Sequence, residues 1–213
     1  MTPRVEACDD GTSPTVFEGK YLQAGAVGGR LVKGFFAAVE ALIARARPRD
    51  VLEVGCGAGY STPRLRAMLP DEVALEASHI DAANVRRARR LAPGVPIVRE
   101  SVYDLSRADN VADLVVCLEV LEHLDDPPAA LTELARVART GVILSVPREP
   151  LWRVLNLARG AYLRDLGNTP GHVQHWSRRS FVGRVATCFA VEAVRCPLPW
   201  TIVWARCVEG RET

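Results

Sequence analysis

Residues 51–60 read Val51-Leu52-Glu53-Val54-Gly55-Cys56-Gly57-Ala58-Gly59-Tyr60. A short apolar run around an acidic residue is followed by three glycines at alternate positions, and a helix-like segment begins after them. This order predicts a strand, a tight turn and a helix N-terminus. Glycine adopts turn conformations that other residues avoid and lets a ligand lie directly on the backbone. The stretch therefore predicts a ligand-binding turn, of a kind that dinucleotides and phosphates also use.

Strands and helices alternate around this turn, with crossovers long enough for parallel pairing, and the last two strands suit an antiparallel hairpin. The sequence therefore predicts an α/β fold with a doubly wound, mostly parallel, seven-stranded Rossmann-like sheet that binds ligands at the carboxyl ends of its strands. The expected strands are 50–54, 72–75 with Glu76 at its end, 96–99, 112–117, 142–146, 189–194 and 200–206. The expected helices are 29–46, 62–69, one capped by Asp81, one opened by Pro127 and ended by Gly141, and one capped by Ser177.

Length and composition suit one domain, because 213 residues with 48% hydrophobic side chains can build a full core. We expect a partly loose N-terminal segment, 1–28, that can cover the active site, and a single domain, 29–213, with a substrate-side insert at 148–176. A formal net charge of +2 argues against an extended surface for nucleic acid. The six cysteines are scattered, and no signal peptide or membrane-spanning run is present, so a cytoplasmic protein with reduced thiols is expected.

Carboxylates mark three of the expected strand ends. Glu53 precedes the glycines, Glu76 ends the second strand, and Glu119 opens the segment Glu119-Val120-Leu121-Glu122-His123. In such folds a carboxylate about twenty residues beyond the first glycine binds ribose hydroxyls, which is the spacing of Glu76. The Gly-Cys-Gly-Ala-Gly turn differs from the Gly-x-Gly-x-x-Gly of nicotinamide dinucleotide sites, so that ligand is disfavoured.

With LEVGCGAG, the strand ending at Glu76, ESVYDL at 100–105 and DLVVCLEVLEHL at 113–124, the chain resembles class I S-adenosylmethionine-dependent methyltransferases, and most of all the small-molecule branch that includes the quinone-biosynthesis methyltransferases. The resemblance implies S-adenosylmethionine as the cofactor, with Glu76 accepting hydrogen bonds from both ribose hydroxyls and Ala77 flanking the adenine. The residues that it implies for cofactor binding are Glu53, Gly55, Cys56, Gly57, Gly59, Glu76, Ala77, Ser101, Val102, Tyr103 and Leu118.

A sulfonium methyl group is already activated, so transfer needs positioning, with a base or a metal only where the acceptor must lose a proton. The expected catalytic residues are His123, Glu119 and His175. If the fourth strand runs into a helical turn, Glu119, Glu122 and His123 point the same way and, with His175, would bind a divalent cation such as Mg²⁺ or Zn²⁺. Some relatives with a similar Glu-x-x-Glu-His use such a metal. The alternative is the common family ending, in which His123 bonds to backbone without a metal.

The insert at 148–176 is expected to cover the acceptor, by analogy with the family. Its mixture of Trp, Leu, Tyr and Arg leaves three interpretations open: an apolar site for an acceptor that carries a carboxylate or phosphate, a surface that docks on a membrane to reach a lipid-linked acceptor, or an ordinary amphipathic cap. The residues expected to contact the substrate are Tyr21, Trp152, Tyr162 and His172.

The resemblance implies an S-adenosylmethionine-dependent methyltransferase that acts on a small molecule, at a hydroxyl oxygen. One alternative is a metal-dependent RNA 3′-end methyltransferase, which the near-neutral charge disfavours. The other is a non-catalytic subunit that binds the cofactor without turning it over.

Overall fold

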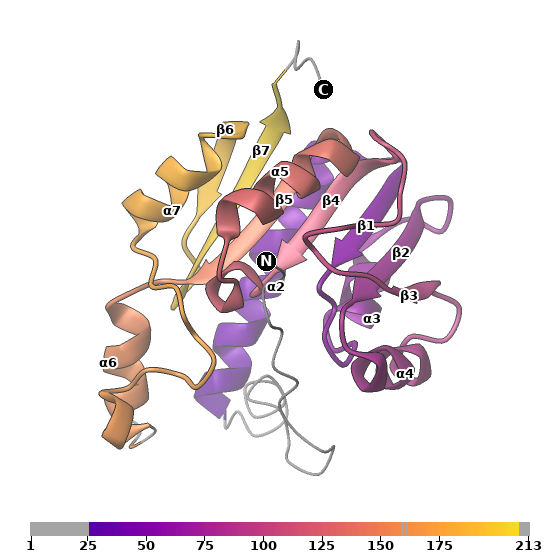
Figure 1. Cartoon of the computed structure of the whole chain (residues 1–213). Coiled ribbons are helices and arrows are strands. Elements are labelled where there is room, and N and C mark those ends of the chain that lie inside the picture. Colours follow the sequence, from indigo (N-terminus) through magenta and orange to yellow (C-terminus); the bar gives the residue numbers. More distant parts are fainter. Residues whose placement is uncertain (1–25, 159, 161, 209–213) are drawn as a thin grey trace, which may run out of the picture.

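The computed structural model describes residues 26–158, 160 and 162–208, which build a seven-stranded sheet in the order β3-β2-β1-β4-β5-β7-β6 (Figure 1). The strands from β3 to β5 pair in parallel, and β7 pairs antiparallel with both β5 and β6. The predicted mixed sheet with its C-terminal antiparallel hairpin is thus confirmed. Strand order reverses between β1 and β4, the kind of place where doubly wound sheets bind ligands.

The strands are β1 (Asp50–Val54), β2 (Ala74–His79), β3 (Ile97–Arg99), β4 (Ala112–Leu118), β5 (Ala138–Pro147), β6 (Phe189–Arg195) and β7 (Trp200–Cys207). The helices are α2 (Ala26–Ala46), α3 (Thr62–Met68), α4 (Ala82–Leu91), α5 (Pro127–Val137), α6 (Leu151–Ala158) and α7 (Arg178–Val185), with short 3-10 turns at Leu121–His123 and Leu163–Asp165. No helix in this described part of the chain is long and apolar enough to cross a bilayer.

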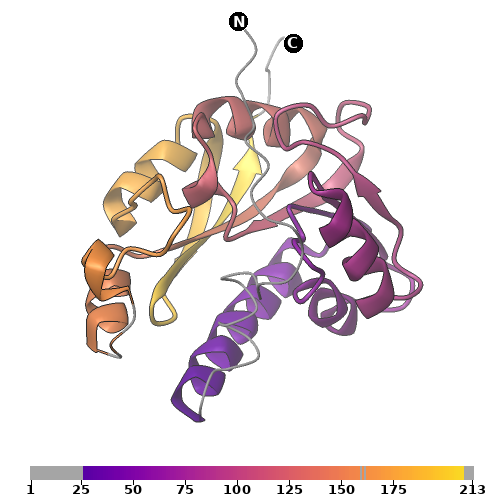
Figure 2. The ribbon, with the colours of Figure 1, turned by 60° about the horizontal axis from the view of Figure 1, so that its bottom comes forward.

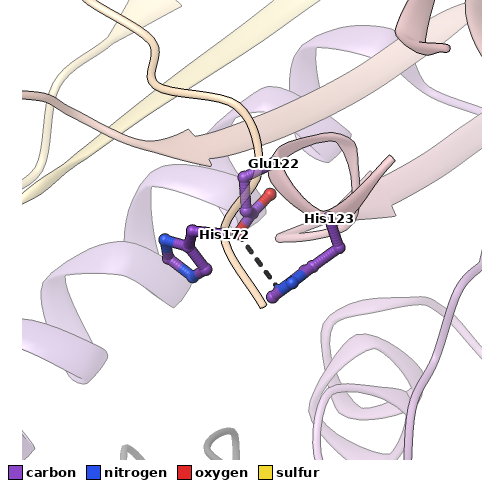
Figure 3. A group of neighbouring side chains, drawn as sticks. All are labelled: Glu122, His123 and His172. Atoms are coloured by element: carbon purple, nitrogen blue, oxygen red, sulfur yellow. Dashed lines mark ion pairs between the residues drawn. The ribbon is translucent and has the colours of Figure 1, made fainter. Parts of the chain in front are cut away.

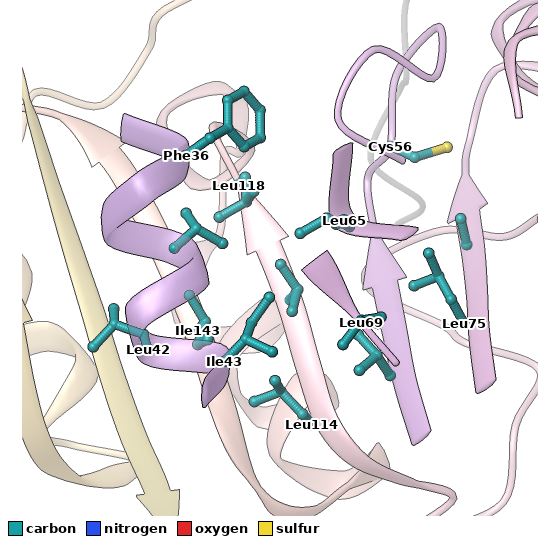
Figure 4. Close-up of a cluster of buried hydrophobic side chains, with 14 of the residues drawn as sticks. Phe36, Leu42, Ile43, Cys56, Leu65, Leu69, Leu75, Leu114, Leu118 and Ile143 are labelled. Atoms are coloured by element: carbon teal, nitrogen blue, oxygen red, sulfur yellow. The ribbon is translucent and has the colours of Figure 1, made fainter. Parts of the chain in front are cut away.

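Helices cover both faces of the sheet, as Figure 2 shows, and β4 explains why. All seven of its residues are buried, and they alternate between two cores because successive strand side chains point to opposite faces. Leu114 and Val116 join α2, α3 and α4 in one core, part of which Figure 4 shows. Val115 and Cys117 join α5 and α7 in the other.

Most element boundaries lie within one or two residues of the prediction, and larger differences occur at the first helix, at Gly141 and at the second strand. The first helix begins at Ala26 rather than at residue 29. Gly141 does not end a helix but lies inside β5, where a Cβ atom would overlap the carbonyl oxygen of Ala205 on β7. The second strand continues past Glu76 to His79, because pairing with β1 and β3 extends it beyond its apolar residues. This last difference changes the functional site.

A charged cluster fixes the amino end of the sheet. The buried Asp113 carboxylate accepts hydrogen bonds from the Arg49 backbone N–H at 3.0 Å, from Arg49 Nε at 2.9 Å and from Arg139. These bonds, those from Arg49 first, hold the pKa of Asp113 well below its usual range.

We expect Asp113→Asn to lower the free energy of unfolding at pH 7 by about 1.5–3 kcal/mol, because hydrogen bonds to a charged group are lost. A carboxyl with a depressed folded pKa stabilises the fold above its unfolded pKa, about 3.9, and this contribution fades as the pH falls below that value. Urea denaturation at pH 7 measures the loss of stability, and the same measurement at pH 3 shows whether the loss becomes smaller. Asp109→Asn is the control, because its half-exposed ion pair with Arg136 should contribute under about 1 kcal/mol. Equal losses in the two variants would contradict the assignment.

Candidate functional site

The glycine turn joins the end of β1 to α3, and its first two N–H groups are tied to β2. Gly55 N and Cys56 N both donate to the Ser78 carbonyl at 2.9 Å. Gly55, Gly57 and Gly59 all have positive φ, a conformation that side chains disfavour. The predicted turn therefore stands beside the carboxyl end of β2.

The three glycines serve different purposes. A Cβ atom on Gly55 would overlap Val120, and one on Gly59 would lie 2.5 Å from Ala88 Cα on α4. A Cβ atom on Gly57 would meet nothing within 4 Å. Gly55 and Gly59 thus permit close packing, whereas the open backbone at Gly57 fits a ligand that lies directly on the turn.

Glu53 and Cys56 lie beneath the turn rather than on it. The buried Glu53 carboxylate accepts hydrogen bonds from Ser61 and from Thr62 Oγ1, the latter at 2.6 Å, so it fixes the start of α3. Burial raises the pKa of Glu53, and the two hydroxyl bonds offset part of that rise. The Cys56 side chain is in the core, and burial, then the nearby Glu53 charge, raise its thiol pKa to about 12. Both predicted cofactor residues support the turn from inside.

The second strand places Glu76 and Ala77 away from the carboxyl end. Glu76 pairs in register with Leu52, two residues before β1 ends, and its carboxylate bonds to Arg107 Nη1 at 2.6 Å. Ala77 is fully buried in the core. The residue at the strand end is His79, which the sequence reasoning did not select. The expectation that Glu76 ends this strand is therefore wrong.

Residues 100–107 form a tight turn next to β2. Asp104 N donates to the Ser101 carbonyl at 3.0 Å, and Tyr103 N donates to Ser101 Oγ at 3.2 Å. Tyr103 is 40% exposed, and its hydroxyl accepts a bond from Asp126 N. Val102 packs against the α5 core. Ser101 and Tyr103 thus remain candidate contacts for a ligand at the strand ends, on a turn braced by its own hydrogen bonds.

Glu119 points into the protein. Its φ of +58° is left-handed, and it follows Leu118, the last residue of β4. The buried carboxylate accepts bonds from Ser145 Oγ at 3.0 Å and from Trp200 Nε1 at 2.8 Å. The 3-10 turn begins only at Leu121, so Glu119 does not share a face with Glu122 and His123, and its expected metal role is not supported by this geometry.

Glu122, His123 and His172 come together instead (Figure 3). One potential ligand atom from each lies within 4.8 Å of the others, and His123 Nε2 lies 3.9 Å from Glu122 Oε1. His123 Nδ1 is 2.8 Å from the Gly171 carbonyl oxygen. A carbonyl only accepts, so Nδ1 carries the hydrogen of this bond and Nε2 is the basic nitrogen of the neutral ring.

Residues 172–177 lie in neither a helix nor a strand, and His172 and His175 have different neighbours. His175 Nε2 lies 2.7 Å from Arg153 Nη2, so His175 does not join the cluster as expected. Of the expected substrate residues, Trp152 is buried and stacks on His172 with ring centroids 6.2 Å apart. Tyr162 immediately precedes the 3-10 turn of the insert, and its backbone there is left-handed. Tyr21 lies outside the described residues.

Residues 52–146 match the family model described as "Methyltransferase domain". This span contains the glycine turn, β2 and the Glu122–His123 segment. Residues 52–146 form a class I S-adenosylmethionine-dependent methyltransferase domain. The resemblance inferred from the motifs is thus confirmed for the part of the chain that builds the site.

Curated relatives match about half of this chain. A probable S-adenosylmethionine-dependent methyltransferase of Mycobacterium tuberculosis is 33% identical over 105 residues, 49% of this chain and 37% of the relative. A ubiquinone biosynthesis O-methyltransferase of Hahella chejuensis is 32% identical over 99 residues, 45% of this chain and 41% of the relative. This chain therefore spans well under two thirds of the length of these relatives.

Solved structures show the same fold. The magnesium protoporphyrin IX methyltransferase of Synechocystis superposes with a TM-score of 0.63 at 21% identity, over 87% of this chain and 89% of that one. The [4+2]-cyclase SpnF superposes with a TM-score of 0.60 at 17% identity, over 82% of each chain. Since one of these neighbours is a cyclase, the fold by itself does not decide the reaction.

Proposed function

We propose that the chain transfers the methyl group of S-adenosylmethionine to a hydroxyl oxygen of a small-molecule acceptor. The observation that carries the proposal is the packing of Val120 over Gly55, where a Cβ atom would overlap the valine. This contact sets the segment that bears His123 directly against the glycine turn. Methyl transfer to a neutral hydroxyl needs a base next to the site where the methyl donor binds. The ubiquinone biosynthesis O-methyltransferase of Hahella chejuensis supports oxygen as the accepting atom.

His123 is the base in this proposal. Its Nδ1–H donates to the Gly171 carbonyl, which holds the ring and leaves Nε2 as the basic nitrogen. The bound cofactor supplies a methyl group activated by its positive sulfur. As the acceptor oxygen attacks the methyl carbon, the C–O bond forms, the C–S bond breaks, and the hydroxyl proton passes to Nε2. S-adenosylhomocysteine and the methyl ether are the products.

The loop that carries His172 is fixed to the same segment. Val173 N and Gln174 N both donate to the Glu122 carbonyl, at 2.9 and 3.0 Å. Two imidazoles and a carboxylate form a donor set that suits Zn²⁺ or a similar divalent cation, and a backbone partner on the second ring nitrogen, as at His123, is common among metal ligands. In this alternative Glu122, His123 and His172 would hold the metal, in place of the four residues expected from sequence, and His123 Nε2 would be a ligand instead of the base. There it would lower the pKa of a bound hydroxyl.

The insert offers apolar side chains for the acceptor or its carrier. Val154 is 55% exposed, Leu163 60% and Leu166 73%. Residues 148–176 contain four arginines and two acidic residues, a balance that suits an anionic lipid surface or an anionic acceptor. A lipid-linked acceptor therefore stays a prediction of this proposal.

We expect the protein to release S-adenosylhomocysteine when given S-adenosylmethionine and a phenol or a catechol, with an equal amount of methylated product found by mass spectrometry. A parallel arm presents a long-chain phenol in vesicles of anionic lipid, which should be the better substrate if the insert docks on membranes. Cofactor binding without turnover across the whole panel would instead favour a non-catalytic subunit.

A further inference from the structure

The end of β2 carries a histidine where the proposed function needs a partner for the cofactor's ribose. We infer that His79 and Asn84, and not Glu76, meet the ribose hydroxyls. The inference rests on the proposed function, because it concerns the binding of the same methyl donor. It concerns residues of this chain that depart from the carboxylate usual at such sites.

Glu76 lies too early in the strand for this role. It pairs with Leu52, whereas the glycine turn begins after Val54, and each strand residue advances about 3.3 Å. Its carboxylate is held by Arg107, which also bonds Glu100 Oε2 at 2.9 Å. Ligands bind beyond the carboxyl ends of parallel strands, so Glu76 would have to leave Arg107 and still reach past three further residues of β2.

His79 stands at the required place. Ser78, its neighbour, receives both N–H bonds from the start of the glycine turn, and His79 is the last residue of β2. The His79 carbonyl accepts a bond from Glu100 N at 3.2 Å, which fixes the strand end against the next crossover. Asn84, in the first turn of α4, lies with Nδ2 3.2 Å from His79 Nε2.

The pair can offer both kinds of hydrogen-bonding group without a charge. An amide nitrogen only donates, so His79 Nε2 accepts from Asn84 and Nδ1 carries the ring hydrogen. Burial lowers the pKa of His79, and the nearby Asp81 charge opposes this effect without reversing it. The lowered pKa favours the neutral ring. Nδ1–H and the amide oxygen of Asn84 then give one donor and one acceptor, matching two hydroxyls that each do both.

Moving the ribose contact from Glu76 to His79 is a shift of three residues along the chain. The same shift moves the position expected to flank the adenine from Ala77 to Ile80. Ala77 is fully buried, whereas Ile80, which follows His79, has a side chain that is 41% exposed. An apolar face at Ile80 suits the flat surface of a purine. His79 with Asn84 thus fits the ribose, and Ile80 fits the adenine of the same nucleoside.

Isothermal titration calorimetry with S-adenosylhomocysteine tests the inference. We expect His79→Ala to weaken binding on the order of tenfold, the loss of about one well-formed hydrogen bond, and Glu76→Ala to leave it within about twofold. His79→Glu, which places a carboxylate at the strand end, should restore the affinity, which a merely structural histidine would not allow. The wild type should also prefer S-adenosylhomocysteine over its 2′-deoxy analogue, and His79→Ala should lose that preference. Circular dichroism and thermal midpoints establish that each variant is folded.

Loss of binding in Glu76→Ala with normal binding in His79→Ala would overturn the inference and return the ribose to Glu76. Unchanged binding in both variants would also overturn it, while leaving the proposed function intact. Absence of binding by the wild-type protein would overturn the proposed function itself, and the inference with it.

Discussion

Gly59→Ala is expected to cost the protein about 2–5 kcal/mol of stability, the sum of left-handed backbone strain and overpacking. Gly59 has a φ of +89°, and an added Cβ atom would lie 2.5 Å from Ala88 Cα and 2.7 Å from Ala88 Cβ. The clash involves the backbone of α4, which cannot turn aside as a flexible side chain would. Urea denaturation followed by circular dichroism measures the loss, and a variant as stable as the wild type would mean that α4 does not pack on the turn.

Gly57→Ala is the matched control, because it has the same chemistry and a similar backbone but open space. With φ +57° and nothing within 4 Å of an added Cβ atom, it should lose only about 1–2 kcal/mol. Its effect is expected on the ligand: affinity for S-adenosylhomocysteine should fall at least about tenfold, because the methyl group occupies the surface on which the cofactor lies. Undiminished affinity in this folded variant would show that the cofactor does not rest on the turn.

Much of the fold follows from the sequence because its strongest patterns are local. Buried β4 has an almost wholly apolar sequence, and Asp81 and Ser177 cap their helices as expected, accepting from Asn84 N and Ser180 N. The end of β2 was misplaced for a physical reason. Its last residues, Ser78 and His79, are polar, so hydrophobicity ends before the strand does, and pairing with two neighbouring strands carries it further.

The site was harder to predict because it depends on backbone conformation. A helical continuation would have brought Glu119 onto the face of His123, but one left-handed residue sends its side chain to Trp200, 81 positions away in the sequence. No local signal marks such a residue, since glutamate seldom adopts positive φ. The choice between His172 and His175 depends on the path of an irregular loop, which their spacing of three residues does not give.

The other large effect is expected at His123, whose replacement by glutamine should lower kcat by about 10²–10⁴-fold, the usual contribution of a general base. Affinity for S-adenosylhomocysteine should stay the same, because the ring of His123 bonds to the Gly171 carbonyl and not to the glycine turn. Acceptors with a more acidic hydroxyl should lose less activity, since they need less help to release the proton. Single-turnover assays with a series of substituted phenols measure both effects.

His175→Gln is the control for this experiment, because His175 contacts Arg153 outside the cluster and should leave kcat within about twofold. The His172→Gln variant and a chelator distinguish the two possible roles of His123, as a base and as a metal ligand. If His123 acts alone, neither should reduce the rate on the scale of His123→Gln. If a cation is bound, both should, and dialysed protein should recover activity and thermal stability when Zn²⁺ or Mg²⁺ is returned. A His123→Gln enzyme with wild-type kcat on every phenol would refute both roles, and the proton would then have to leave by a route that does not involve this side chain.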